Sequence, residues 1–297
     1  MSNVLKSIEL STGVILEYYE QGSPRGIPVI LLHGMGDSWR SFEQVFPYLP
    51  EDYRVIAPTQ RGHGNSSKPE KEYSYSHFAS DLAAFMDTLN IDTAIIVGHS
   101  SGSSHAKRFA LDYPERTMGL VLIGSFSDVS NNPSDVELWD EVISKMEDPL
   151  NPDLLRELQE DTIAREIPQQ FFETMVKESL KVPARVWKAI VLRDLEEDMS
   201  VEQGKIKAPV LILWGNQDTG IPRSEQDLQV KTIPNSNLLI YEGAGHSLHW
   251  EEPERFAVDL VTFIENIRQD KLQKNHCLWE ETNDSFPPME ADARERI

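Results

Sequence analysis

The fold of this chain is decided by the stretch Ile95-Ile96-Val97-Gly98-His99-Ser100-Ser101-Gly102-Ser103-Ser104, in which an apolar run ends in a Gly-x-Ser-x-Gly pentapeptide. An apolar run without alternation is typical of a strand that is covered on both faces of a sheet. When such a strand enters a sharp turn, the central serine takes a strained, exposed position, and the flanking glycines let neighbouring backbone approach. Ser100 is therefore the candidate nucleophile, although the pentapeptide alone also fits an ordinary glycine-rich turn.

Further apolar runs alternate with amphipathic segments on both sides of this stretch. We predict buried strands at 27–32, 53–57, 118–124, 209–214 and 238–241, and two short strands at an antiparallel edge within 7–20. A helix is expected to begin after Asp37 or Ser38, where apolar residues recur at helical spacing up to position 49. Strands that alternate with helices predict an α/β fold: a mostly parallel sheet of about eight strands with helices on both faces.

This alternation stops between residues 126 and 205, where prolines separate several amphipathic helices and no strand is expected. We predict that 127–205 form a helical cap, inserted into a core made of 1–126 and 206–268. The remaining 269–297 form a polar, acidic tail without sustained periodicity, which we expect to be disordered.

Composition excludes several classes of protein. The 297 residues carry a formal net charge of -21, which argues against nucleic acid and anionic membrane surfaces as partners, because phosphate binding needs clustered Lys and Arg. The longest apolar runs fall far short of the ~18 residues that cross a bilayer. Residues 1–6 lack the apolar core of a secretory signal, and the single cysteine, Cys277, agrees with a reducing compartment. A cytoplasmic location is therefore expected.

Three polar residues follow the ends of predicted buried strands, where open α/β sheets bind their ligands: Ser100, Asp218 and His246. A serine hydroxyl needs a base within reach; an imidazole can take its proton, and a carboxylate can orient that imidazole. The chain order Ser…Asp…His is one of the arrangements known for such a set. Asp128, after the preceding strand, is the alternative candidate for the acid.

By these motifs the chain resembles the α/β-hydrolase superfamily over roughly residues 7–268. Five pieces in matching order carry the resemblance: His33-Gly34-Met35-Gly36, Arg61-Gly62-His63-Gly64-Asn65-Ser66, the pentapeptide, Trp214-Gly215-Asn216-Gln217-Asp218 followed by Pro222, and Gly245-His246. The resemblance implies a capped, mostly parallel sheet with Ser100 as nucleophile, Asp218 as acid and His246 as base. It also implies an oxyanion hole formed by the backbone N–H groups of Met35 and Ser101.

Other polar residues of these motifs are expected to be structural. Many relatives have an acidic residue at the position of Thr59, for which we expect a role in loop packing. We interpret His33, His63 and His99 as scaffold residues, with the side chain of His99 pointing away from the nucleophile, and His249 as a residue on the side of a helix or at the rim. No histidine pair has a convincing metal-site spacing and no phosphate-binding fingerprint is present, so we expect neither a metal nor a cofactor.

The sequence thus predicts a cofactor-independent serine hydrolase that cleaves a small, largely apolar carboxylic ester, lactone or related acyl compound through an acyl-enzyme. The cap is expected to set substrate size, and the oligomeric state stays open. Candidate pocket walls, besides the oxyanion residues, are Trp39, Phe126 and Leu248. Alternatives are carbon–carbon bond hydrolysis of a diketone or cofactor-free perhydrolysis on the same triad, and a slow-turnover ligand receptor whose cap signals to a partner.

Overall fold

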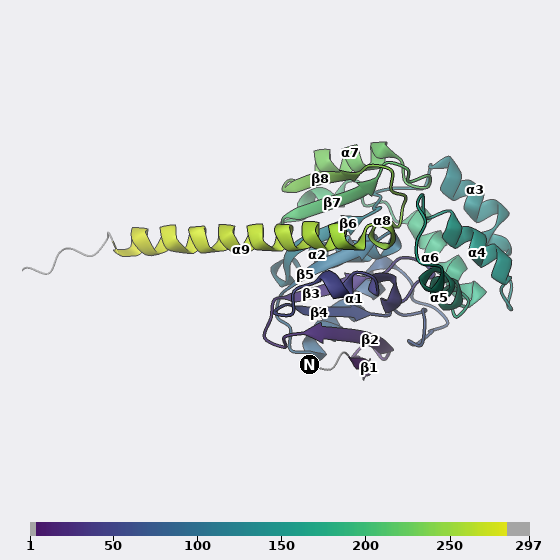
Figure 1. Cartoon of the computed structure of the whole chain (residues 1–297), viewed down its shortest axis with the longest axis horizontal. Helices are drawn as coiled ribbons and strands as arrows, with labels where there is room; N and C mark the ends of the chain where they lie inside the picture. The colour runs from purple at the N-terminus through teal and green to yellow at the C-terminus, as the bar shows by residue number, and fades with distance from the viewer. Residues whose placement is uncertain (1–3, 284–297) are drawn as a thin grey trace, which may run out of the picture.

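The computed structural model describes residues 4–283, whose strands form a single eight-stranded sheet (Figure 1). In chain order the strands are β1 (Val4–Glu9), β2 (Ile15–Gly22), β3 (Pro28–Leu32), β4 (Arg54–Pro58), β5 (Ala94–His99), β6 (Thr117–Ile123), β7 (Val210–Gly215) and β8 (Ser236–Tyr241). In space their order is β1-β2-β4-β3-β5-β6-β7-β8. The pairs β1/β2 and β2/β4 are antiparallel and all other neighbours are parallel, which confirms the predicted sheet with its antiparallel edge.

Helices cover both faces of the sheet. Successive strand residues point to opposite faces, and in the central strands both sets of side chains are apolar, so both faces must be covered. In β5, Ile96 joins a hydrophobic cluster with residues of α1 (Tyr75–Thr88) and α2 (Ser101–Asp112). Its neighbours Ile95 and Val97 join the opposite cluster, which contains residues of α8 (Leu248–Glu251) and α9 (Pro253–Asn283). A strand with apolar residues on both faces is what the unbroken apolar run predicts. The remaining core helices are η3 (Pro114–Arg116) and α7 (Arg223–Thr232).

The segment after β3 differs from the predicted helix. It forms two short 3-10 turns, η1 (Trp39–Phe42) and η2 (Phe46–Tyr48). The hydroxyl of Ser38 accepts a hydrogen bond from the backbone N–H of Arg40 and so caps the first turn, as expected. Pro47 lacks a backbone N–H and prevents a continuous α-helix through this segment. The apolar spacing therefore identified the buried face but not the type of helix.

Residues 127–205, which we call the cap segment, are helical between β6 and β7. They contain α3 (Pro133–Glu141), η4 (Ile143–Lys145), α4 (Pro152–Glu160), α5 (Gln169–Ser179), α6 (Ala184–Glu196) and η5 (Glu202–Lys205). Asn132 and Asn151 cap α3 and α4 with their side chains, and each is followed by a proline that suits the first helical turn. Figure 1 shows α3 to α6 gathered at one end of the molecule.

Buried hydrogen bonds tie the two ends of the cap segment to each other and to the core. The backbone N–H of Ser127 donates to Oε2 of Glu225 in α7 at 2.7 Å, and its hydroxyl donates to Oε1 of Gln203 at 3.0 Å. The N–H of Met199 donates to the carbonyl of Ser127 at 2.9 Å. The start and the end of the cap segment are therefore held together beside α7.

The last helix is longer than predicted. Phe256, Leu260 and Ile264 anchor the first half of α9 on the sheet, and the helix then continues to Asn283, away from the rest of the molecule (Figure 1). The stretch 269–283 contains no Gly or Pro, and an anchored helix propagates without a new nucleation step, which agrees with the longer helix. The disorder of the acidic tail stays a prediction. The rest of the predicted tail, 284–297, lies outside the described residues. Across 4–283, no helix combines the length and apolar content needed to cross a membrane.

Candidate active site

Ser100 occupies a strained turn between β5 and α2. Its φ of 52° and ψ of -127° lie in a region that residues with a Cβ rarely adopt. The backbone N–H of Ser100 donates to the carbonyl of Ile123 at 2.9 Å, and its own carbonyl accepts from the N–H of Ser103 at 2.7 Å. These bonds hold the serine at the carboxyl end of β5, as the pentapeptide predicts.

Two glycines make this turn possible because there is no room for a side chain at either position. A Cβ on Gly98 would lie 2.4 Å from the carbonyl oxygen of Gly102, and one on Gly102 would lie 2.4 Å from that of His33. Gly34 is also close to the turn, since a Cβ there would lie 2.9 Å from Nδ1 of His99 and 3.2 Å from Cβ of Ser100. The loop that contains Met35 is thereby packed against the candidate nucleophile.

His246 and Asp218 form a hydrogen-bonded pair from the loops that follow β8 and β7. Nδ1 of His246 lies 2.7 Å from Oδ2 of Asp218, whose other oxygen accepts from the N–H groups of Gly220 and Ile221 at 3.0 and 2.9 Å. Burial lowers the pKa of His246, but the charge and hydrogen bond of Asp218 outweigh it and raise that pKa above 6.5. Asp128, the alternative acid, instead accepts from the N–H of Ser130. This geometry favours Asp218 as the partner of the imidazole.

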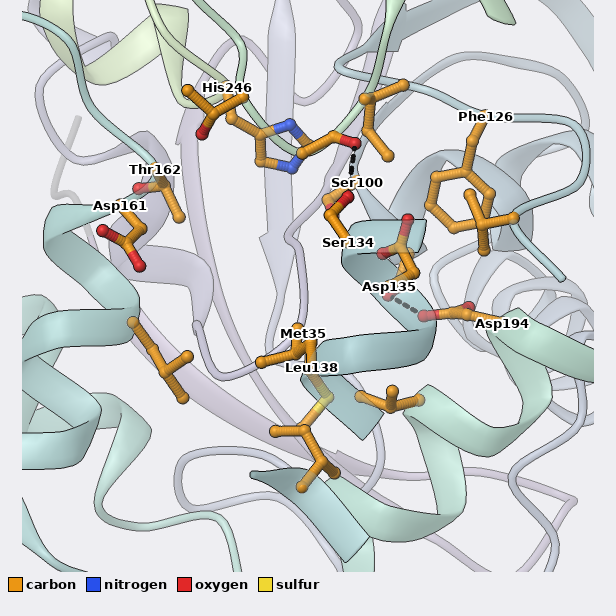
Figure 2. Close-up of a pocket in the computed structure, with 18 of the residues that line it drawn as sticks. Met35, Ser100, Phe126, Ser134, Asp135, Leu138, Asp161, Thr162, Asp194 and His246 are labelled. Carbon is orange, nitrogen blue, oxygen red and sulfur yellow. Dashed lines mark hydrogen bonds between the residues drawn. The ribbon is translucent and has the colours of Figure 1, made fainter. Parts of the chain in front are cut away.

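Ser100 and His246 line the same cavity, which has a volume of about 530 Å³ (Figure 2). The predicted wall residues Met35, Ser101 and Phe126 also line it. The opposite wall comes from the cap segment, through residues of α3, α4 and α6 that include Asp135, Leu138, Leu158, Trp187 and Asp194. The cavity therefore lies between the carboxyl ends of the strands and the cap segment.

Two predicted wall residues lie elsewhere. Trp39 packs in the core beneath the sheet edge, where its ring stacks on Tyr19 at 4.8 Å. Leu248 is fully buried in the same cluster, at the start of α8. Both positions follow a site motif closely in sequence, but 3-10 and helical turns direct these side chains back onto the sheet. Their placement in the pocket wall was wrong.

The cavity wall is strongly acidic. Six carboxylate residues line it, and no lysine or arginine within 4–283 is among the lining residues; the six are Asp37, Asp135, Glu137, Glu141, Asp161 and Asp194. Burial raises the pKa of Asp37 and of Asp194 to about 7 and that of Asp135 to about 6. Within the described part of the chain, Oδ2 of Asp135 is buried without a hydrogen-bond partner. The cavity wall thus has several acidic groups and no lysine or arginine of 4–283 to pair with an anionic ligand.

Sequence reasoning missed Asp194, which reaches the nucleophile turn from α6. Its Oδ2 accepts a hydrogen bond of 2.5 Å from the hydroxyl of Ser101, marked by the dashed line at Asp194 in Figure 2. Its Oδ1 accepts from the hydroxyl of Tyr75 at 3.0 Å. Asp194 lies 93 residues after Ser101, in a cap helix without a motif, so no local pattern indicates this contact.

Comparison with known proteins identifies the family. Residues 27–146 and 183–253, well over half of the chain, match the family described as alpha/beta hydrolase fold. This chain belongs to the α/β-hydrolase family. The unmatched gap falls within the cap segment, where members of a family that share a core are free to differ.

Similar proteins are named for different activities: a hydrolase, a chloroperoxidase and an esterase. The chain is 30% identical over 278 residues to 2-hydroxy-6-oxononadienedioate/2-hydroxy-6-oxononatrienedioate hydrolase of Burkholderia vietnamiensis, covering 89% of this chain and 95% of that protein. It is 25% identical to a non-heme chloroperoxidase of Streptomyces lividans, over 88% and 99% of the two chains. Among solved structures, an esterase from Exiguobacterium antarcticum matches with a TM-score of 0.78 at 24% identity, over 88% of this chain and 100% of that one.

Two further histidines of this hydrolase pack next to His246, and one of them, His99, also lines the cavity. The ring of His99 is 4.9 Å from that of His246 and 4.6 Å from that of His249. Burial lowers the pKa of His249 to about 3 and that of His99 well below 6.5, so both rings stay neutral. His249 lies on α8 and is fully buried, with Nε2 3.2 Å from the hydroxyl of Ser41, so of its two predicted places the structure has the helix side and not the rim. The turn of α8 directs it inward, onto Phe42.

The remaining polar residues of the family motifs make structural contacts, as predicted. Nε2 of His33 accepts from the backbone N–H of Gln60 at 2.9 Å, and Nδ1 of His63 lies 3.0 Å from the carbonyl oxygen of Arg61. The hydroxyl of Thr59 accepts from the N–H of Trp39 at 3.2 Å, which fits a role in loop packing. Over the part of the chain that the structure describes, no group of three or more His, Cys, Asp or Glu side chains is arranged to hold a metal ion.

Proposed function

We propose that this α/β-hydrolase is a serine hydrolase that cleaves a small, uncharged, largely apolar carboxylic ester, lactone or related acyl compound. One observation carries the proposal: a serine in a strained turn shares a cavity with an imidazole that is hydrogen-bonded to a buried carboxylate. Ser100 is the nucleophile, His246 the base and Asp218 the acid of this proposed triad. An acyl-enzyme on Ser100 is the intermediate.

In the proposed mechanism Asp218 accepts a hydrogen bond from the Nδ1–H group of His246 and so keeps the proton on Nδ1. Nε2 is then unprotonated and can accept the proton of the Ser100 hydroxyl. Attack of the serine oxygen on the acyl carbon produces an oxyanion, toward which the N–H groups of Met35 and Ser101 donate. Collapse of this intermediate expels the alcohol, which takes the proton from His246. A water molecule, deprotonated by the same imidazole, then releases the acid and restores Ser100.

The charge of the cavity supports an uncharged acyl group. The Burkholderia relative is named for a dienedioate, a substrate with two carboxylates, whereas six carboxylate residues and no lysine or arginine of 4–283 line this cavity. A buried anion without a positive partner is costly, and like charges raise that cost further. This favours ester or lactone hydrolysis over carbon–carbon bond cleavage of a dienedioate.

The size of the cavity supports a small substrate. A volume of about 530 Å³ lies within the range of roughly 300 to 1,000 Å³ for small-molecule sites. Apolar side chains of the cap segment, among them Leu138, Leu158 and Trp187, form much of the wall opposite Ser100. We therefore propose that residues 127–205 act as a cap that limits the length of the acyl group. The cytoplasmic location stays a prediction.

Labelling by a fluorophosphonate probe, together with 4-nitrophenyl esters of increasing acyl length, tests this function. We expect the wild type to be labelled at Ser100 and to prefer short or medium acyl chains. We expect Ser100→Ala to be unlabelled and to lose about 10⁴-fold or more in kcat. Wild type that is not labelled, or Ser100→Ala labelled equally, would remove the proposal. A kcat well below ~1 s⁻¹ on every ester, with ligand-dependent partner binding, would favour a receptor.

A further inference from the structure

We propose that Asp194 is a positioning residue that holds Ser101, and with it one N–H of the oxyanion hole, in place from the cap segment. The inference rests on the proposed function, because it assigns a role to the oxyanion donors of that reaction. It makes acyl transfer depend on the position of α6, rather than on the core alone.

The contact between the two residues is short and largely buried. The hydroxyl of Ser101 donates to Oδ2 of Asp194 at 2.5 Å, and the exposed fractions of the two residues are only 3% and 9%. Bonds from a hydroxyl to a carboxylate are shorter and stronger than those between neutral groups. The hydroxyl of Tyr75 donates to the other carboxylate oxygen of Asp194, and the backbone N–H of Tyr75 donates to Oε1 of Glu197 at 3.3 Å. The end of α6 is therefore fixed to the starts of α1 and α2.

Residue 101 is a sensitive place for such a contact. Ser101 is the first residue of α2, so its N–H has no partner within the helix and is free to face a developing oxyanion. The direction of that N–H depends on the backbone of the strained turn, and a shift of about 1 Å in a reacting geometry costs about 100-fold in rate. A bond from the Ser101 side chain to a fixed carboxylate limits such shifts.

The same cap helix also contacts the other side of the oxyanion hole. Gly36, next to Met35, has a φ of 81°, and a Cβ there would lie 2.6 Å from Cη2 of Trp187 in α6. The loop with the second proposed oxyanion donor is therefore packed against α6, seven residues before Asp194. Helix α6 thus touches both loops that supply oxyanion donors.

Protonation of Asp194 would weaken the contact. Burial raises the pKa of Asp194 to about 7, and the nearby carboxylates of Asp135 in α3 and Glu197 after α6 also raise it. The hydrogen bonds from Ser101 and Tyr75 lower this pKa, but by less. The basic group that interacts with Asp194 is Lys107 of α2. An ionised carboxylate accepts from both hydroxyls, whereas a carboxylic acid must use one oxygen as a donor. The contact is therefore complete only above the pKa of Asp194.

The pH profile of kcat/KM for 4-nitrophenyl butyrate, followed by chromatography of the released phenol, gives the first test. His246 must lose a proton for activity, and protonation of Asp194 is expected to cost a further factor of roughly ten. In wild type log kcat/KM therefore falls with a slope above one through the pKa of Asp194, by about one extra log unit, and returns to a slope of one at lower pH. In Asp194→Asn the amide has one acceptor and one donor, like the protonated acid. This variant is expected to be roughly tenfold slower at high pH and to fall with a slope of one throughout. An Asp194→Asn profile that keeps the extra step of the wild type overturns the inference.

A double-mutant cycle gives the second test. Asp194→Leu and Ser101→Ala each remove the bond and are expected to lower kcat by roughly tenfold, the scale of a hydrogen bond to a charged group, with KM within about twofold. The double variant loses no more than either single one. Glu196→Gln is the matched control, because Glu196 lies at the same helix end and its carboxylate pairs with the half-exposed Arg193 of its own helix; we expect this variant to stay within about twofold of wild type. Losses that multiply in the double variant, or an equal loss in Glu196→Gln, contradict the inference.

Two measurements separate the possible failures. Thermal unfolding of each variant identifies those that lose activity because they do not fold. If Asp194→Leu or Ser101→Ala does not fold, the pH profile of Asp194→Asn against that of wild type decides the question. Fluorophosphonate labelling of wild type tests the proposed function itself. Absent labelling overturns that function, whereas labelling with unchanged Asp194 variants overturns only the positioning role.

Discussion

The cavity has two walls, which hold their polar groups by different means. The core wall contains Ser100 and His246, and the cap wall contains Asp135 and Asp194 of the cap segment. On the core side, the backbone fixes Ser100: its turn is strained, and neither Gly98 nor Gly102 has room for a Cβ. On the cap side, side-chain hydrogen bonds and burial hold Asp194, and Asp135 projects an oxygen without a partner. The polar groups of the core side are thus placed by local backbone geometry, whereas those of the cap side are placed by contacts between separate helices.

The largest expected effect tests the core wall. Asp218→Asn is expected to lower kcat by about 10³- to 10⁴-fold, because an amide at this position favours the wrong tautomer of His246. Asp128→Asn, the matched exchange after the preceding strand, is expected to stay close to wild type, since Asp128 bonds only locally to Ser130. Steady-state kinetics on one ester measures both. The reverse pattern would show that the acid comes from the strand before the cap segment.

An intermediate effect tests the cap wall. At pH 8, where the acidic residues of the wall are ionised, the mono-4-nitrophenyl ester of adipic acid is expected to react about 10- to 100-fold more slowly, in kcat/KM, than the 4-nitrophenyl ester of hexanoic acid. The two esters have the same chain length and differ in one terminal carboxylate. Asp135→Asn should narrow the ratio. Equal rates for both esters in wild type would mean that the acidic wall does not contact the acyl chain.

The smallest expected effect is on stability, and it tests how tightly the backbone of the core wall is packed around the nucleophile turn. Gly102→Ala is expected to lower the free energy of unfolding by about 1–3 kcal/mol, since its Cβ would lie 2.4 Å from the carbonyl oxygen of His33. Gly220→Ala is the control, because its nearest neighbour would be Oδ1 of Asp218 at 3.6 Å, an ordinary contact. Urea unfolding measures both. A Gly102→Ala variant as stable as Gly220→Ala would show that the turn relaxes easily.

The sequence predictions failed where a side chain is placed by distant contacts. Trp39 and Leu248 follow site motifs closely, yet both face the core. His249 is buried, because the turn of α8 packs onto η1. In the cap segment, periodicity predicted the helices, but nothing near Asp194 indicates its bond to Ser101. Short motifs report backbone demands, whereas these placements depend on how separate elements pack.

The sequence by itself determined the α/β class, the strained turn at Ser100 and the set of candidate triad residues. It did so because glycine positions, unbroken apolar runs and polar residues at strand ends are local consequences of sterics and burial. Only the tertiary structure decided that Asp218 rather than Asp128 faces His246, and that the cavity wall is acidic. It alone brought Asp194 of the cap segment to Ser101. Such contacts join residues far apart in the chain, and their distances are set by the packing of whole helices on the sheet.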